Sequence, residues 1–552
     1  MSDADGERRL VDFFWKKSYN EEYGALGRKK SKVLVWKGKI LMKKVAHVLF
    51  GRVFVVGISI LLQVAWLILV WWQFSYKFSY ANMFIRALAI ILVLVIVNKW
   101  INPANKLSWT FLILFSPIVG TLIYFLFGRS DLTRWTRKRM DAVDQEVSAC
   151  LVRDEEAETE LKEKDIAAYQ QSKYINDWGR FPLYRNTSTK YYKCGEDMFP
   201  DMLEALRSAE HFIFMEYFIV EEGYMFDTIV DILEEKVRQG VEVRFIYDDV
   251  GSVSTLPPKY YEVLKKKGIN CVAFNPFLPI ISVVMNNRDH RKIMVVDGYV
   301  GFTGGINLAD EYINQKERFG YWKDTGIRIE GEGVWSLTTM FLSMWNYISR
   351  SSEDYEAFKP SVYQKRPFVD DGFVQPYGDS PLDHENVGEN VYLNMINKAK
   401  EYVYIFTPYL IIDHETMVTL CNAAKNGVDV RIVTPGIPDK KMVYLLTQSY
   451  YEPLIEAGVK IYQYTPGFIH AKCFVCDDEL ATVGTVNLDF RSLYLHFECG
   501  VWMYQSEAVM QVKEDCLETF ACSEEITLEF CRNRALPIRI LQGMLRLFAP
   551  LL

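Results

Sequence analysis

Two stretches of the chain carry the same reactive residue types at the same spacing. Residues 289–310 read DHRKIMVVDGYVGFTGGINLAD, and residues 469–490 read IHAKCFVCDDELATVGTVNLDF. In both stretches Lys follows His by two positions, Asp by seven and Asn by seventeen. The residues are His290, Lys292, Asp297 and Asn307 in the first stretch and His470, Lys472, Asp477 and Asn487 in the second. One His-x-Lys is common by chance, but two copies in one register indicate an internal duplication.

The His-Lys pairs suit chemistry on a phosphodiester. Residues i and i+2 of a β-strand share a face, so His290 and Lys292 should point the same way, and likewise His470 and Lys472. A neutral imidazole is a nucleophile that can form a phosphoryl-histidine, and an ammonium neutralises the non-bridging oxygens. Two copies allow one imidazole to attack and the other to protonate the leaving alcohol. The sequence shows no cluster of metal ligands, so we expect two lysines in place of a metal and no cofactor.

Other residues around the motifs are candidates for substrate binding. Asn307 and Asn487 offer amide donors, with Gly305 and Thr485 beside them, and glycine lets a backbone approach a ligand closely. We take these four as expected substrate-binding residues.

Two kinds of carboxylate have open roles. Asp297 and Asp477 either take part in catalysis or only fix the turn of a hairpin. Asp324 and Glu498 each begin an alternating strand after a motif. They are candidates for supporting carboxylates that orient the imidazoles, with ordinary surface carboxylates as the alternative.

The elements that must position these residues alternate between strand and helix. Residues 241–251 (VEVRFIYDDVG) and 428–436 (VDVRIVTPG) read as β-strands, and each follows a helical pattern, as in βαβ units. Residues 291–297 and 471–477 are predicted motif strands, and Asp297-Gly298 is a favourable hairpin turn. The Pro, Gly and Asp content of residues 363–386 is typical of a connection between two halves.

Composition narrows the class of protein. The 552-residue chain has a net charge of −7, which argues against nucleic acid as a partner. Residues 27–44 are strongly basic and precede apolar segments, which indicates either contact with an anionic lipid bilayer or a solvated flank. Ten cysteines are scattered along the chain. Cys473 and Cys476 lie three apart on a predicted strand and so on opposite faces, which favours free thiols over a metal site.

Three apolar stretches, residues 53–72, 87–97 and 107–127, predict a membrane segment. Basic residues flank it on both sides, which favours two cytoplasmic flanks and an even number of crossings. We therefore expect a multi-pass cell-membrane protein whose catalytic region is cytoplasmic. The stretch that contains Pro117 is the candidate for a re-entrant segment.

From about residue 85 the chain resembles the bacterial cardiolipin synthases of the phospholipase D superfamily. The resemblance rests on the paired motifs and on EYFIVEEG, IYDDVGS, YWKDT, TPYLIID and the C-terminal RILQGMLRLFAPLL. It implies an α/β fold of two phospholipase D-like α-β-α halves with mixed sheets, after an N-terminal transmembrane helical segment. It also implies that both His, both Lys and both Asp residues of the motifs are catalytic.

These observations together predict six segments. They are a basic cytoplasmic tail (1–49), a membrane segment of two or three helices (50–128), a helical connector (129–178), a first half (179–355), a connector (356–385) and a second half with a C-terminal interfacial helix (386–552).

The function implied is a phosphatidyl transfer from one phosphatidylglycerol to another through a phosphohistidine, giving cardiolipin and glycerol. We assign attack to His290. The alternatives are a membrane-bound hydrolase of the same superfamily and a non-catalytic membrane scaffold. The acceptor alcohol and the oligomeric state are left open.

Overall fold

The structure is a computed structural model that describes residues 79–128, 134–276, 287–364, 367–383 and 385–551, with five further positions between 61 and 69. The predicted basic tail lies outside the described residues, as does most of the first apolar stretch. The chain divides into two compact units, Met1–Trp66 and Leu67–Leu552, and every helix and strand named below belongs to the second.

Helices occupy the region before the first sheet. They are α3 (Ser79–Val97), α4 (Pro103–Phe115), α5 (Pro117–Phe127), α6 (Arg134–Cys150), α7 (Glu155–Lys164), α8 (Ile166–Tyr174) and the π-helical segment η1 (Ile175–Gly179).

The apolar stretch 107–127, the candidate for a re-entrant segment, is divided between two helices. Proline has no N–H to continue the helical ladder, so α4 ends at Phe115 and α5 begins at Pro117. Helix α5 then packs against α4: a Cβ on Gly120 would lie 2.3 Å from the carbonyl oxygen of Leu112. Within the described ranges, no helix is both long enough and apolar enough to cross a bilayer. The expectation of spanning helices is therefore not met in this part of the chain.

The first half contains seven strands in its main sheet, two shorter strands and the helices that cover them. The elements are β1 (Thr187–Tyr192), α9 (Gly195–Ser208), β2 (Phe212–Tyr217), α10 (Tyr224–Arg238), β3 (Glu242–Asp248), α11 (Tyr260–Lys266), β4 (Asn270–Phe274), β5 (Arg288–Asp289), β6 (Ile293–Val296), β7 (Val300–Gly304), η3 (Asp310–Ile313), β8 (Tyr321–Lys323), β9 (Gly326–Gly331) and α12 (Val334–Ser349).

Two short helices, η4 (Tyr355–Phe358) and α13 (Pro360–Tyr363), lead to the second half. Its elements are β10 (Phe373–Asp379), α14 (Val387–Lys398), β11 (Tyr402–Phe406), β12 (Leu410–Ile411), α15 (His414–Lys425), β13 (Asp429–Pro435), α16 (Lys441–Gln448), α17 (Tyr451–Glu456), β14 (Lys460–Tyr464), β15 (Gly467–Ile469), β16 (Cys473–Cys476), β17 (Leu480–Gly484), β18 (Leu488–Asp489), α18 (Phe490–Leu495), β19 (His496–Tyr504), α19 (Glu507–Ala521), β20 (Ser523–Glu525), α20 (Leu528–Arg532), α21 (Leu536–Phe548) and η5 (Ala549–Leu551).

The two main sheets repeat one strand order, as the sequence duplication predicts. The first runs β1-β9-β7-β6-β2-β3-β4, and the second runs β10-β19-β17-β16-β11-β13-β14 and adds β20 at its end. In each, three neighbouring strands are parallel and the others antiparallel. The expected α/β fold with mixed sheets in two halves is therefore confirmed.

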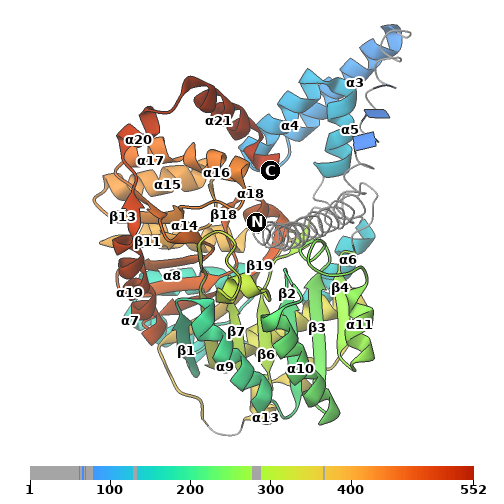
Figure 1. Cartoon of the computed structure of the whole chain (residues 1–552), viewed down its shortest axis with the longest axis vertical. Helices are drawn as coiled ribbons and strands as arrows, with labels where there is room; N and C mark the ends of the chain where they lie inside the picture. Colours follow the sequence, from blue (N-terminus) through green and yellow to red (C-terminus); the bar gives the residue numbers. More distant parts are fainter. Residues whose placement is uncertain are drawn as a thin grey trace, which may run out of the picture. The chain divides into compact units, whose positions relative to one another are not determined.

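The halves pack through a shared central layer. Alternate strand residues face different cores: Phe214 of β2 lies in the central core, whereas Met215 lies in the core under α9 and α10. The central core also holds α12, α19 and residues from both sheets, while α14 and α15 cover the outer face of the second sheet (Figure 1). The order of layers is helices, sheet, two helices, sheet, helices.

One strand of the second sheet lies in the segment predicted to be a connector. Strand β10 pairs with β19 along its whole length, from Phe373 to Asp379. Its Pro376 favoured a loop in the sequence, but β10 is an edge strand, where a missing backbone donor is tolerated. The second half therefore begins earlier than residue 386.

Short strands join the two halves at their junction. Strand β5 of the first half pairs in parallel with β19 of the second, and β15 of the second pairs in parallel with β8 of the first. These two pairs occupy corresponding places, because β5 directly precedes His290 and β15 directly precedes His470. The junction between the halves is therefore where both motifs lie.

Candidate active site

The His290 ring is held by a carboxylate from the other half. Its Nδ1 lies 2.9 Å from both carboxylate oxygens of Glu498, a fully buried residue of β19. Glu498 also accepts hydrogen bonds from the hydroxyls of Ser492 and Thr485. A carboxylate at Nδ1 favours the tautomer that carries its proton there, which leaves the Nε2 lone pair of His290 for chemistry.

His470 has the mirror arrangement. Its Nδ1 lies 2.6 Å from Oδ2 of Asp324, which is buried and follows β8 in the first half. The other carboxylate oxygen, Oδ1, accepts the backbone N–H of Thr325 at 2.9 Å. Each imidazole therefore takes its orienting carboxylate from the opposite half. The sequence indicated both carboxylates, but not the crossing.

The strand pairs explain this crossing. The backbone N–H of His290 donates to Phe497 at 2.9 Å, next to Glu498, and that of His470 donates to Lys323 at 2.7 Å, next to Asp324. His290 and Lys292 lie in the gap between β5, which ends at Asp289, and β6, which begins at Ile293. The predicted strand over residues 291–297 therefore starts later than expected.

Two buried lysines accompany the histidines. Lys292 Nζ donates to the carbonyl oxygen of His290 at 2.5 Å, and Lys472 Nζ donates to that of His470. Burial lowers the pKa of Lys292 to about 8 and that of Lys472 to about 7. Both ammonium groups are therefore close to losing their proton at neutral pH, so a bound phosphodiester anion would help to keep them charged.

Both imidazoles are held neutral in the free site. Burial, together with the charges of Lys292 and Lys472, keeps the pKa of His290 well below its ordinary value. Burial and Lys472 also lower the pKa of His470 to about 4, against the opposing effect of Asp324. Burial raises the pKa of Asp324, but the hydrogen bond from His470 and the positive charge of Lys472 outweigh it, so the carboxyl pKa stays below its usual value. Because groups of the second motif act on His290, the two motifs share one electrostatic environment.

The structure does not bring Asp297 and Asp477 to the histidines. Asp297 follows β6 at the end away from His290, and its carboxylate accepts three backbone N–H groups of residues 210–212, each at 2.8 Å. Asp477 accepts those of residues 400–402 at 2.7–2.9 Å. Asp297 and Asp477 have positive φ angles of 48° and 55°, and two-residue hairpin turns of type I′ require a positive φ at this position. Their contacts therefore match the turn-fixing alternative.

The four expected substrate-binding residues have different surroundings. The Asn307 amide accepts from the Ile219 N–H at 2.9 Å and donates to the Tyr312 hydroxyl at 2.8 Å. Oδ1 of Asn487 has no hydrogen-bond partner among the described residues. A Cβ on Gly305 would lie 1.9 Å from Oδ1 of Asp324, and Thr485 binds Glu498. Gly305 and Thr485 thus contact the carboxylates beside the two histidines, and among the described residues the Asn487 side-chain oxygen is left without a donor.

A third histidine beside the site was missed in the sequence. The His496 ring lies 5.5 Å from that of His290, between centroids. His290, His496 and Glu498 together form a group that could ligate a metal ion, which corrects the expectation that the chain holds no such cluster. This group of three residues could not be recognised in the sequence, because His290 is more than 200 residues away from His496. Its only signal was a histidine two positions before the strand carboxylate.

Cys473 and Cys476 point to opposite faces of their strand, as predicted. Cys473 lies in the central core and Cys476 in the outer core of the second half, on opposite faces of β16. All ten cysteines are free thiols.

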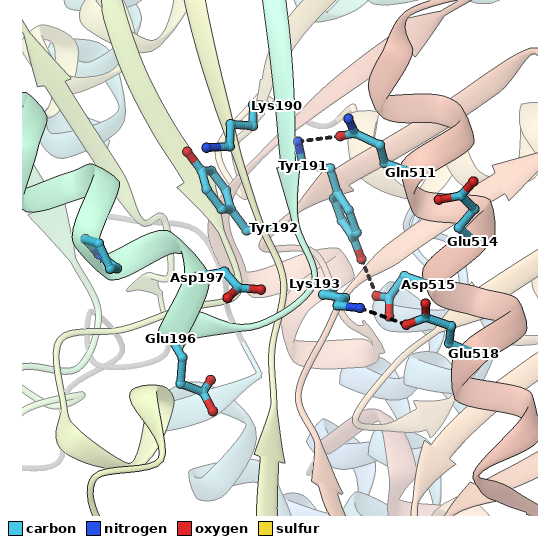
Figure 2. Close-up of a pocket in the computed structure, with 11 residues that line it drawn as sticks. Lys190, Tyr191, Tyr192, Lys193, Glu196, Asp197, Gln511, Glu514, Asp515 and Glu518 are labelled. Carbon is cyan, nitrogen blue, oxygen red and sulfur yellow. Dashed lines mark hydrogen bonds and ion pairs between the residues drawn. The ribbon is translucent and has the colours of Figure 1, made fainter.

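A cavity of about 510 Å³ lies away from the histidines, between β1, α9 and α19 (Figure 2). In it the Tyr191 hydroxyl donates to Asp515 at 2.7 Å, and Lys193 pairs with Glu518 at 2.9 Å. Asp515 also binds the buried Lys323 ammonium at 2.7 Å. Because Lys323 directly precedes Asp324, this ion pair helps to fix the carboxylate that orients His470.

Two models of known families match the chain. The family model described as "Cardiolipin synthase, PLD-like domain" matches residues 202–329 and 392–518, one match in each half. A second model, described as "Phospholipase_D-nuclease N-terminal", matches residues 87–129.

Individual relatives span most of the chain. A Streptococcus mutans protein of unassigned function is 46% identical over 465 residues, 83% of this chain and 99% of that protein. A cardiolipin synthase of Alkalihalophilus pseudofirmus is 35% identical over 457 residues, 82% of this chain and 90% of that protein. A crystal structure of a phosphatidylserine synthase from Haemophilus influenzae has a TM-score of 0.51 at 16% identity, covering 70% of this chain and 97% of that one. This last likeness concerns the fold alone.

Proposed function

The chain belongs to the cardiolipin synthase family of phospholipase D-like proteins, and we propose that it joins two phosphatidylglycerol molecules into cardiolipin with release of glycerol. The enzyme is a phosphatidyltransferase. One observation carries the mechanism: two buried imidazoles, each bonded at Nδ1 to a carboxylate of the opposite half, present Nε2 for the reaction.

In the first step, the Nε2 lone pair of His290 attacks the phosphorus of phosphatidylglycerol. The P–O bond to the glycerol headgroup breaks, and His470, protonated once the anionic substrate is bound, gives its proton to the leaving oxygen. The product is a phosphatidyl-histidine and free glycerol. The ammonium groups of Lys292 and Lys472 stabilise the charge on the non-bridging oxygens.

In the second step, His470 is neutral and acts as a base. It takes the proton of a hydroxyl group on a second phosphatidylglycerol, and that oxygen attacks the phosphorus. The P–N bond to His290 breaks, cardiolipin leaves, and both imidazoles return to their first state.

The surroundings of the two histidines support this assignment of roles. The neutral ring must attack, and burial together with the charges of Lys292 and Lys472 holds the pKa of His290 well below its ordinary value. Asp324 lies only 2.6 Å from His470 and partly offsets the effect of burial on the pKa of that ring. We therefore assign the proton transfer to His470.

We also propose that the enzyme works at the cytoplasmic face of the cell membrane, held there by the segment before its catalytic halves. Both substrates are lipids, and α3 exposes large apolar side chains such as Phe84, Leu88 and Ile91. Helix α21 exposes Ile540 and Met544, while its Gln542 side chain packs on α16 through the carbonyl oxygen of Leu445. Such a helix, with one face packed and one apolar face exposed, suits the bilayer interface.

The test is a product analysis with the purified full chain and labelled phosphatidylglycerol in mixed micelles. Equal amounts of cardiolipin and glycerol, lost in both His290→Ala and His470→Ala, are expected. Phosphatidic acid as the main product would assign the chain to the rival hydrolase. Turnover unchanged by both substitutions would refute the two-histidine mechanism.

A further inference from the structure

Three ligand-type side chains meet on one side of the His290 ring. The ligand atoms of His290, His496 and Glu498 lie within 4.8 Å of one another. Oε1 of Glu498 is 2.9 Å from Nδ1 of His290 and 3.7 Å from Nδ1 of His496. Tetrahedral zinc with bonds of about 2.0–2.2 Å places its ligand atoms about 3.3–3.6 Å apart. Small side-chain rotations would therefore complete a three-ligand site with an open fourth position.

His496 has no other hydrogen-bonding role in the described part of the chain. Within the described residues neither ring nitrogen has a partner at hydrogen-bond distance, the Glu498 oxygen being 3.7 Å from Nδ1, although the side chain is only 11% exposed. Glu498 already accepts from His290, Ser492 and Thr485, so it has little capacity left for a second imidazole. A buried polar group without a partner carries a free-energy cost, which a ligand at this place would remove.

The other half provides an internal comparison. Trp322 stands two positions before Asp324, as His496 stands two positions before Glu498. The Trp322 ring lies 5.6 Å from that of His470, which matches the 5.5 Å between His496 and His290. The duplicated fold thus puts an imidazole, which is able to bind a metal ion, at one of two equivalent positions and an indole at the other. A metal ion would distinguish the two histidines.

The donor set selects the kind of ion. Two imidazole nitrogens and one carboxylate oxygen suit Zn²⁺ and its neighbours, whereas Mg²⁺ and Ca²⁺ require oxygen ligands. The ammonium groups of Lys292 and Lys472 oppose any cation, so an ion that forms strong bonds to nitrogen is needed.

We propose that His290, His496 and Glu498 form an inhibitory site for a zinc-class ion. In the active enzyme the ring proton of His290 is on Nδ1 and the lone pair is on Nε2. A metal ion on Nδ1 uses the lone pair of that nitrogen, and the proton moves to Nε2. The ring then has no electron pair for the phosphorus. The inhibition rests on the proposed function, whereas the binding of the ion does not.

The test uses the full-length enzyme, stripped of metal with a chelator and held in detergent micelles. Co²⁺ replaces Zn²⁺ as a visible probe, and we expect one Co²⁺ per chain with the strong absorption of four-coordinate cobalt, removed by added Zn²⁺. We expect Zn²⁺, but not Mg²⁺, to inhibit cardiolipin formation. In His496→Asn the cobalt absorption should be lost, and the activity of the metal-free enzyme should remain. The Zn²⁺ concentration that gives half-inhibition should rise at least roughly tenfold above that of the wild type.

His414→Asn, which changes an exposed histidine on α15, is the matched control and should keep the wild-type zinc response. Wild-type enzyme without a cobalt band would overturn the site. Equal zinc sensitivity in wild type and His496→Asn would overturn the inhibitory role. Absence of cardiolipin formation in metal-free wild type would instead refute the proposed function, and the cobalt measurement would still decide whether the site exists.

Discussion

Replacing Asp297 by asparagine should weaken the fold and leave the chemistry almost intact. The carboxylate is 1% exposed and accepts the N–H groups of Glu210, His211 and Phe212. Asparagine tolerates the φ of 48° but has one acceptor oxygen, so it can keep two of these bonds and turns an NH₂ towards the third donor. An orphaned buried donor costs about 1–3 kcal/mol, and the partly buried N–H of Glu210 lies at the lower end of that range; the two remaining bonds lose their charge assistance. We expect a loss of about 2–4 kcal/mol in the free energy of unfolding.

The assay compares thermal unfolding, followed by near-ultraviolet circular dichroism, with turnover measured well below the unfolding temperature. Asp477→Asn is the matched variant: its three donors correspond to those of Asp297, but the Asp477 side chain is itself only half-buried, so water can more easily replace a lost bond there. Its unfolding temperature should therefore fall less than that of Asp297→Asn, and both variants should retain turnover within about threefold of the wild type. A hundredfold loss of turnover in Asp297→Asn at an unchanged unfolding temperature would refute the reasoning.

Four further outcomes are expected. Glu498→Gln should lower kcat by about 10²–10⁴-fold at temperatures where the variant is folded, because the His290 tautomer is no longer fixed; a loss below tenfold in the phosphatidylglycerol assay would contradict this. Burial lowers the pKa of Lys472 to about 7, so its ammonium is lost as pH rises, and activity should decline above pH of about 7. In Lys472→Arg that decline should move to higher pH, and an unmoved profile would exclude Lys472 as its cause. His470→Ala should accumulate a phosphatidyl adduct on His290 from a substrate with a good leaving group, and His290→Ala none; mass spectrometry that finds the adduct on His470 would reverse the roles. Activity should survive EDTA, and a complete loss restored by one cation would show that a metal is required.

The spacing of the duplicated motifs predicted much of the fold, because residue spacing within a short segment depends on its local backbone conformation. A His-x-Lys followed by an apolar run and Asp-Gly predicts an extended segment and a hairpin, and β6 and β7 form that hairpin around Asp297. The carboxylates were visible as Asp324 and Glu498 for the same reason: each stands at the start of an alternating strand. Local patterns of this kind need no knowledge of the other half.

The sequence did not show which residues of the two halves come together, because these residues are far apart along the chain. The bond between His290 and Glu498 joins residues 208 positions apart, and its register is set by β5 lying beside β19. No local pattern encodes that register. The same limit hid His496, which has meaning only beside His290. Pro376 misled for a different reason, since proline excludes a central strand but not the edge strand β10.

Because each histidine takes its carboxylate from the other half, the active site is complete only when both halves are present and correctly packed. Neither half can hold its own histidine in the reactive tautomer, so no fragment that contains one motif should be partly active. A change that loosens the central layer at any point should silence attack and protonation together, even when both motifs are intact. Because the supporting carboxylates are shared in this way, the two copies are free to diverge around them. Trp322 and His496 are an example of such divergence: one duplicated position has become two different residues, while the catalytic pair still depends on both halves.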